Sequence, residues 1–273
     1  MCGTPAPATG AFSPHPLRHC PTCDLRFRAD IGPEWSEDYV GEADGYARRQ
    51  ELELTGREEQ RAVEAYRRAA WVASRVPSGT LLEIGSAAGE FLDAAARRGF
   101  EARGIEASPS LSARARARYH LDVDQGLAER HLDGGRRYDV ICMWHVLEHA
   151  RSPADLLAAA ASALAPGGWL FVEVPNIASA GARAMGAAWP QLDFEDHAVY
   201  FSPPALEAAL RRSGFRALEL STILAWEYLS GRDRLRPRRL AGRVHRSVVG
   251  RTLRAHHATN GDLLRAVARS RAG

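Results

Sequence analysis

Two glycines and a distant carboxylate are spaced as in a nucleoside-binding pocket. The stretch LLEIGSAAGEFL places an apolar run before Gly85 and Gly89, and Glu106 follows twenty-one positions after Gly85. Glycines adopt backbone conformations closed to other residues and let a ligand come close to the main chain. A carboxylate about twenty residues further on can accept hydrogen bonds from ribose hydroxyls. We therefore predict a pocket for a ligand that contains a nucleoside.

The spacing of the glycines distinguishes between nucleoside ligands. A dinucleotide fingerprint reads G-x-G-x-x-G and sets a pyrophosphate on a helix N-terminus. Here the spacing is G-x-x-x-G, and Glu90 at the start of the next helix would repel an anion. A nicotinamide-dependent oxidoreductase is therefore disfavoured. A cationic nucleoside without phosphate, such as S-adenosylmethionine, fits better, and Glu83 is predicted to orient its ammonium end through the loop.

Two histidines follow an apolar run later in the chain. In YDVICMWHVLEH, His145 and His149 lie just beyond a predicted strand, at the sheet edge where ligands bind. Imidazole has an unperturbed pKa near 6.5, which suits a general base. Both residues are candidates for contact with a substrate, whereas the alternative is that Glu148 and His149 hold the loop by hydrogen bonds. Trp144 is either part of the core or a wall of the cofactor pocket.

The elements that must position these residues alternate between strands and helices. The apolar runs are LLEI, ARGIE, YDVICM, WLFVEV and FRALEL, and helical segments are predicted at 90–98, 109–119, 153–164 and 203–212. Three of these helices begin with a Ser-Pro pair, which places a hydroxyl at the N-cap and proline at the first helical position. The alternation predicts an α/β fold with a parallel sheet covered by helices. An earlier helix is predicted over 45–76, with one apolar face formed by Val63, Tyr66, Ala70, Ala73 and Val76.

Four motifs together resemble those of class I S-adenosylmethionine-dependent methyltransferases. They are LLEIGSAAGEFL, GIEAS, YDVICMWHVLEH and LAPGGWLFVEVPN, within roughly residues 60–222. The resemblance implies a Rossmann-like, seven-stranded, mostly parallel sheet with one antiparallel strand. It also implies that the methionine moiety lies over the Gly85 turn, the ribose on Glu106 and the adenine near the third strand. The predicted cofactor-binding residues are Glu83, Gly85, Ser86, Gly89, Glu106, Ala107, Gln125, Gly126, Leu127 and Trp144.

A further segment resembles a narrower group. FEDHAVYFSPPALEAALRRSGF is similar to the acid-His-x-x-x-Phe-Ser segment of small-molecule and sugar methyltransferases with an N-terminal zinc ribbon. The resemblance implies that His197 lies over the substrate and acts as the base, and Asp196, Asp193 or Glu195 could orient its ring. The predicted catalytic residues are His197, Asp196, His149 and His145. Whether oxygen, nitrogen or carbon is methylated stays open.

The N-terminal cysteines resemble part of that zinc ribbon. Cys20-Pro-Thr-Cys23 is similar to its second knuckle, and Cys2 to the end of a first knuckle. Three thiolates leave one position of a zinc tetrahedron open, for which His15 and His19 are candidates. We expect Cys2, Cys20 and Cys23 to hold a structural zinc, with the alternative that the motif binds no metal. The fourth cysteine, Cys142, lies in an apolar strand and is predicted to belong to the core.

Charge is unevenly distributed along the chain. Twelve arginines and two aspartates follow position 230, although the net charge of the whole chain is only +3. We predict a zinc-ribbon-like segment over 1–44, a methyltransferase domain over 45–229 and an Arg-rich helical tail over 230–273. The tail is expected to pack on the domain or on a second copy of the chain; contact with anionic lipid or with RNA is the alternative. The sequence contains neither a signal peptide nor a run long enough to span a bilayer, which indicates a cytoplasmic protein.

These features predict one function and two alternatives. We expect methyl transfer from S-adenosylmethionine to a small polar metabolite, an oxygen acceptor on a sugar-like or natural-product scaffold, with histidine as the general base. The alternatives are an RNA methyltransferase and a protein that binds S-adenosylmethionine without catalysis. Nucleic acid is the less expected partner, because no aromatic residues are interleaved with the arginines to stack on bases.

Overall fold

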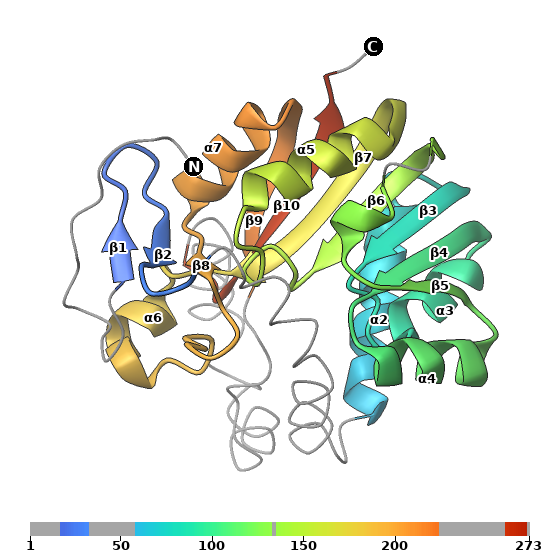
Figure 1. Ribbon diagram of the computed structural model, residues 1–273, viewed down its shortest axis with the longest axis horizontal. Helices are drawn as coiled ribbons and strands as arrows, with labels where there is room; N and C mark the ends of the chain where they lie inside the picture. The colour runs from blue at the N-terminus through green and yellow to red at the C-terminus, as the bar shows by residue number, and fades with distance from the viewer. Residues whose placement is uncertain (1–16, 33–57, 133–134, 224–259, 272–273) are drawn as a thin grey trace, which may run out of the picture.

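The computed structural model describes residues 17–32, 58–132, 135–223 and 260–271. Its centre is a seven-stranded sheet (Figure 1), whose strands in spatial order are β5 (Asp122–Gln125), β4 (Phe100–Glu106), β3 (Gly79–Ile84), β6 (Tyr138–Trp144), β7 (Leu164–Pro175), β10 (Leu263–Ser270) and β9 (Phe215–Ile223). Neighbours from β5 to β7 are parallel, whereas β10 is antiparallel to both β7 and β9. The predicted Rossmann-like α/β fold is confirmed.

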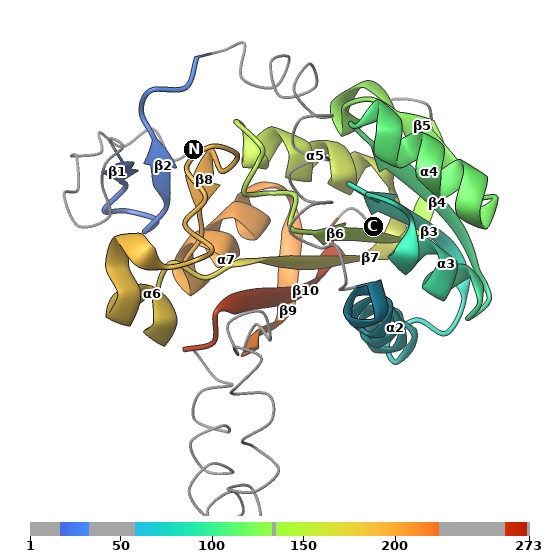
Figure 2. The same ribbon diagram turned by 90° about the horizontal axis from the view of Figure 1, so that it is seen from below.

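Helices cover both faces of this sheet. One face is covered by α5 (Pro153–Ala163) and α7 (Pro203–Arg212), and the other by α2 (Glu58–Ala73), α3 (Glu90–Ala96) and α4 (Pro109–Tyr119). Figure 2 shows α5 and α2 on opposite sides of β6 and β7. In β6, Ile141 and Met143 join the core on the α5 side, whereas Val140 and Cys142 join the core on the α2 side. A strand buried on both faces is apolar throughout, which is why its sequence predicted it well.

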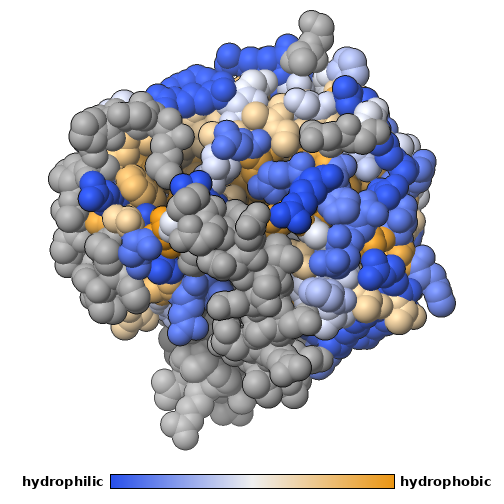
Figure 3. All heavy atoms as spheres, viewed as in Figure 1, coloured by the Kyte–Doolittle hydropathy of each residue, from blue (hydrophilic) through white to orange (hydrophobic). Residues whose placement is uncertain are grey.

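The β5 edge of the sheet is charged. Arg103 lies 2.8 Å from Asp124 and 3.3 Å from Asp122, measured between guanidinium nitrogens and carboxylate oxygens. Figure 3 shows a mostly hydrophilic surface over this side of the molecule, which carries α4 and β5. Charges on an edge strand oppose pairing with strands of other molecules.

The buried face of α2 is not the predicted one. Val63 and Tyr66 are 43% and 62% exposed, whereas Ala65, Ala69 and Val72 are buried against the sheet. Arg68 also points toward the sheet and pairs with the buried Glu173 of β7. That ion pair and the small alanines fix the rotation of the helix, so Val63 and Tyr66 turn outward, whereas Ala73 and Val76 of the predicted stripe pack against the core. The remainder of the predicted helix, residues 45–57, lies outside the described residues.

The end of the chain is a strand rather than the end of a helical tail. Leu263–Ser270 forms β10 and inserts between β7 and β9 as the seventh strand of the sheet. Its side chains alternate, because Leu264, Ala266 and Ala268 face one core and Val267 faces the other. The two arginines in LLRAVARS obscured this alternation in the sequence. Positions 230–259 of the predicted tail lie outside the described residues.

The Cys-x-x-Cys segment forms a hairpin against the main domain. Strands β1 (Leu17–His19) and β2 (Arg26–Arg28) pair antiparallel, and β2 also pairs with β8 (Val199–Tyr200). Cys20 is buried and Cys23 half-buried in the connecting turn, and Nε2 of His19 lies 2.6 Å from the Asp24 carboxylate. Cys2 and His15 lie outside the described residues, so zinc binding stays a prediction.

The segment between β7 and β8 is partly helical. Ala180–Met185 forms the short helix α6, followed by a turn of 3-10 helix over Gly186–Ala188. The hydroxyl of Ser179 caps α6 by accepting a hydrogen bond of 2.8 Å from the N–H of Ala182. The chain then returns through Asp196 and His197 to β8, which brings these residues beside the main sheet.

Candidate active site

The turn after β3 requires glycine at its first position. Gly85 has φ of 72°, and its N–H donates to the carbonyl of Ile105 at 2.8 Å. A Cβ added to Gly85 would lie 2.6 Å from Cγ2 of Val146, in the loop that follows β6. The turns after β3 and β6 therefore approach each other so closely that a side chain does not fit between them.

We expect Gly85→Ala to destabilise the protein by about 1–3 kcal/mol more than Gly99→Ala, because overpacking adds to the backbone cost. Both glycines have positive φ, 72° and 92°, but nothing lies within 4 Å of a Cβ added to Gly99. The control therefore shares the backbone cost and lacks the contact with Val146. Urea-induced unfolding measures the difference, and equal losses of stability would show that the loops can separate freely.

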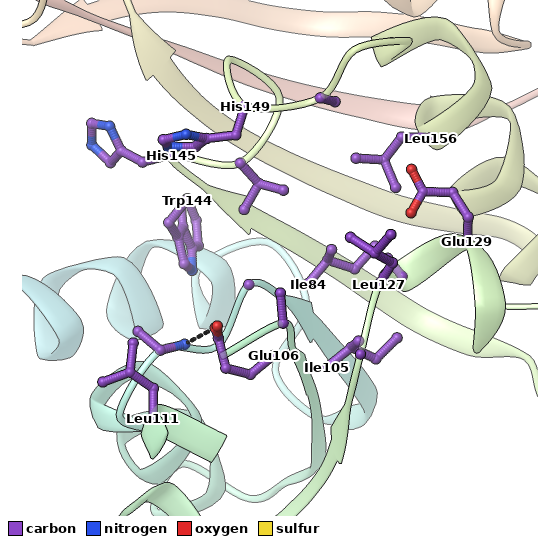
Figure 4. Close-up of a pocket in the computed structure, with 17 residues that line it drawn as sticks. Ile84, Ile105, Glu106, Leu111, Leu127, Glu129, Trp144, His145, His149 and Leu156 are labelled. Carbon is purple, nitrogen blue, oxygen red and sulfur yellow. Dashed lines mark hydrogen bonds between the residues drawn. The ribbon is translucent and has the colours of Figure 1, made fainter. Parts of the chain in front are cut away.

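Glu106 joins the turn after β3 to the start of α4. One carboxylate oxygen accepts a hydrogen bond of 2.7 Å from the N–H of Ala87, and the other accepts one of 2.8 Å from the N–H of Ser108. The residue is 9% exposed, and burial raises its carboxyl pKa, although the two N–H donors act in the opposite direction. Figure 4 shows one of these bonds and the carboxylate at the edge of the pocket. The side chain is thus held in one place before any ligand binds.

A cavity of about 190 Å³ opens beside Glu106 at the carboxyl ends of the strands (Figure 4). Of the predicted cofactor-binding residues, those that line it are Gly85, Glu106, Ala107, Gly126, Leu127 and Trp144. The histidines His145 and His149 line it as well. The sheet therefore brings together residues that are separated by more than sixty positions in the sequence.

Four residues of the predicted cofactor set lie outside the cavity lining. Glu83 is buried within β3, and burial raises its carboxyl pKa well above the ordinary value. Ser86 packs beneath the turn, against Gly104 of β4. The contact is so close that a Cβ added to Gly104 would lie 2.7 Å from the hydroxyl oxygen of Ser86. Gly89 is the N-cap of α3, and the side-chain amide of Gln125 donates to the carbonyl of Ala107 at 3.0 Å. These four positions shape or support the walls of the pocket.

Several lining residues were not identified from the sequence. They are Ile84, Ala87, Ile105, Leu111, Ala128, Glu129, Val146, Ala150 and Leu156. Ala128 and Glu129 come from a 3-10 turn, Ala128–Arg130, just after β5. The signal for Glu129 was present in VDQGLAE as an acid four residues beyond the short strand. Figure 4 shows Glu129 and Leu156 on the far side of the pocket from the histidines.

His145 is an ion-pair partner of two buried carboxylates. Its Nδ1 lies 3.1 Å from Glu148 and its Nε2 lies 3.4 Å from Glu173. Burial lowers the pKa of His145, but the two carboxylates outweigh this effect and raise the pKa to about 10. Both ring nitrogens of His145 are therefore engaged in holding the loop after β6, a role that the sequence had suggested for Glu148 and His149.

Glu173 is the centre of a buried ionic cluster. Its carboxylate contacts Arg68 of α2, Arg265 of β10 at 2.5 Å, and His145. The residue is 1% exposed, and burial alone would raise its pKa. The nearby cations Arg68, Arg265 and His145 instead hold the pKa well below the usual range. This cluster ties together helix α2, strands β7 and β10, and the loop after β6.

His149, which lines the cavity, lies against His197. Their ring centroids are 4.8 Å apart, and Nδ1 of His149 donates to the carbonyl of Asp196 at 2.8 Å. His197 is 7% exposed, and burial, followed by the nearby His149 and His145, lowers its pKa well below 6.5. His197 is therefore neutral at pH 7. Asp196 contributes its backbone to this arrangement, and its N–H donates to the Asp193 carboxylate at 3.1 Å.

Comparison with known proteins identifies the family. A family model described as a methyltransferase domain matches residues 55–220, which is more than half of the chain. The chain therefore belongs to the methyltransferase domain family. It is a class I S-adenosylmethionine-dependent methyltransferase. None of the helices in the described part of the chain is long and apolar enough to cross a membrane.

Individual relatives are distant. The ubiquinone biosynthesis O-methyltransferase of Burkholderia pseudomallei (strain 1710b) is 26% identical over 174 residues, 57% of this chain and 73% of the relative. A possible histamine N-methyltransferase from Thermotoga maritima has a TM-score of 0.57 at 16% identity and covers 87% of this chain and 99% of its own. The 1,6-didemethyltoxoflavin-N1-methyltransferase of Burkholderia thailandensis has a TM-score of 0.56 at 16% identity, with coverages of 92% and 98%. These two solved structures show the shared fold.

Proposed function

We propose that the protein transfers a methyl group from S-adenosylmethionine to an oxygen atom of a small polar metabolite. The observation that carries the proposal is that one cavity joins Gly85 and Glu106 to His145 and His149. Donor and acceptor can then meet at the carboxyl ends of β3 and β6, where ligands bind in sheets of this type. Oxygen as the acceptor atom is supported by the names of the curated relatives, which are O-methyltransferases of ubiquinone biosynthesis.

The residues around the cavity fit the methyl donor. Gly85 lines the cavity with main chain that carries no side chain, against which the methionine moiety can lie, and the fixed carboxylate of Glu106 suits the two ribose hydroxyls. Leu127, Ala128 and Leu156 offer an apolar wall for adenine. Bound there, S-adenosylmethionine supplies an electrophilic methyl carbon. The protein has to align the acceptor oxygen with this carbon and remove the proton of the hydroxyl.

The pair of His149 and His197 is the favoured group for removing that proton. Both nitrogens of His145 face carboxylates, which leaves His149 and His197 to act on the acceptor. We assign the base to His197, as the sequence resemblance implies, because its ring contacts that of His149, which lines the cavity. Asp196 holds the pair in place through its carbonyl bond to His149. General bases of this kind contribute about 100- to 10,000-fold to a rate.

We expect His197→Asn to lower the turnover number by about 100-fold or more and to leave the affinity for S-adenosylmethionine unchanged, because His197 does not line the cavity beside Glu106. His120→Asn is the control, since His120 is an exposed residue at the end of α4. Transfer of a labelled methyl group to a panel of hydroxylated metabolites measures the rate, and calorimetry measures the affinity. Full turnover of the His197 variant would remove this residue as the base, and transfer to RNA alone would contradict a small-molecule acceptor.

A further inference from the structure

We propose that Glu148, His149 and His197 form a binding site for a divalent transition-metal cation at the acceptor side of the pocket. The ligand atoms that these three side chains offer lie within 4.8 Å of one another. Ligand atoms at about 2.1 Å from a tetrahedral metal ion are about 3.4 Å apart, so small side-chain rotations bring them to binding distance. The group contains two imidazoles and one carboxylate, a ligand set found in catalytic zinc sites and in non-haem iron sites.

Two atoms of this site are buried without a hydrogen-bond partner in the described part of the chain. They are Oε2 of Glu148 and Nδ1 of His197, in residues that are only 1% and 7% exposed. A buried polar atom left without a partner costs about 1–3 kcal/mol. Native structures therefore pair such atoms with protein, water or ions. A cation between the carboxylate and the ring nitrogen would satisfy both at once.

The surrounding hydrogen bonds are those that orient metal ligands. His149 donates its Nδ1–H to the carbonyl of Asp196 at 2.8 Å, so the ligand role falls to Nε2. The second oxygen of Glu148 faces Nδ1 of His145 at 3.1 Å. In metal sites a ligating histidine typically donates its other N–H to a carbonyl or carboxylate, and a ligating carboxylate is itself hydrogen-bonded. Both features are present before any ion binds.

The backbone also fixes the distance between the two parts of the site. The carbonyl of Glu148 accepts hydrogen bonds from the N–H groups of Ala198 and Val199, at 2.8 and 3.1 Å. These bonds clamp the loop after β6 to the segment that carries His197 into β8. Ligands almost fifty positions apart in the sequence are therefore held together by the fold. Such preorganisation favours binding, because little chain entropy remains to be lost.

The ligand types indicate which cation the site would take and what it would do. Imidazole favours zinc, cobalt, iron and related ions over magnesium and calcium, which prefer oxygen. Three protein ligands leave at least one coordination position open. If the proposed function holds, the acceptor hydroxyl occupies that position. The cation then makes the hydroxyl more acidic, the proton passes to solvent and the oxygen keeps its electron pair. In this arrangement His197 is a metal ligand rather than the base.

Titration of the chelator-treated full chain with Co²⁺ tests the site. We expect one Co²⁺ with visible d–d bands and no thiolate charge-transfer band at this site, and an ion at Cys20 and Cys23 is told apart because it would add such a charge-transfer band. Glu148→Gln and His149→Asn should each weaken this Co²⁺ binding by at least about 100-fold, the upper end of what loss of an outer-sphere partner costs. The controls are Glu207→Gln and His120→Asn, which change exposed residues of the same types and should leave the affinity unchanged.

The outcomes separate the site from the proposed function. Unchanged Co²⁺ affinity in both ligand variants, with circular dichroism showing folded protein, would overturn the metal site. Full methyl transfer by chelator-treated protein would overturn the catalytic role of the cation and leave His197 as the base. Protein that binds Co²⁺ through these residues but methylates no oxygen acceptor would keep the site and refute the proposed function.

Discussion

Glu106→Ala is expected to weaken binding of S-adenosylmethionine by about 100-fold or more. Hydrogen bonds to a charged group are worth about 1.5–3 kcal/mol each. Two ribose hydroxyls bound to one carboxylate therefore account for a factor of about 100 to 10,000. The carboxylate is fixed by the N–H groups of Ala87 and Ser108, so it needs no reorganisation before it accepts the ribose bonds.

Two further variants make this test specific. Glu101→Ala changes an exposed acid on the same strand, β4, whose side chain is 69% exposed and pairs with Arg136. It should leave the affinity unchanged. Glu106→Gln preserves the shape of the side chain and should fall between the wild type and the alanine variant. Calorimetry measures all three, and wild-type affinity in folded Glu106→Ala would refute the ribose assignment.

The fold could be predicted where its causes are local. Strands buried on both faces are continuous apolar runs, and glycines and Ser-Pro pairs mark where the helices end and begin. Even at these helix starts, one N-cap side chain is bonded to a residue far away in the sequence. Ser108 accepts the predicted cap bond from the N–H of Leu111 at 3.2 Å, whereas the hydroxyl of Ser202 donates to the carbonyl of Asp24, at 3.4 Å, in the N-terminal hairpin. The side chain of Ser152 makes no cap bond either.

The candidate site was predictable only residue by residue. Gly85, Glu106 and the histidines each stand at the carboxyl end of a predicted strand, so the sheet edge that they share followed from the topology. The contact between His149 and His197 could not be predicted from the strand topology. It depends on the path of the chain through α6 to β8, a segment without a clear apolar period.

The ionic cluster at Glu173 could not be predicted from the sequence either. Arg68, Glu173 and Arg265 come from α2, β7 and β10, and no local pattern relates them. An arginine in a helix or a strand is usually solvated, whereas the side chains of Arg68 and Arg265 are only 18% and 19% exposed. Their pairing with Glu173 explains two errors at once. Arg68 sets the face that α2 presents to the sheet, and Arg265 allows a basic segment to become an interior strand between β7 and β9.

This cluster leads to the second large expected effect. Glu173→Gln should destabilise the protein by about 3–5 kcal/mol, because removing one partner of a buried ion pair leaves the opposite charges uncompensated. The neutral amide would face Arg68, Arg265 and His145 in a site where Glu173 is only 1% exposed. Domains of this kind are stable by about 5–15 kcal/mol, so a large part of the total would be lost.

Glu219→Gln is the matched control, since Glu219 pairs with Arg75 at 2.6 Å but is 39% exposed, and surface pairs contribute about 0–1 kcal/mol. Urea-induced unfolding at pH 7 should show the large loss for Glu173→Gln alone. The pKa of Glu173 is lower in the folded protein than in the unfolded chain, so its stabilisation is present above the unfolded value of about 4.3 and declines as the pH falls below it. The gap between wild type and variant should therefore narrow at acidic pH. A constant gap would mean that the variant loses packing rather than charge compensation.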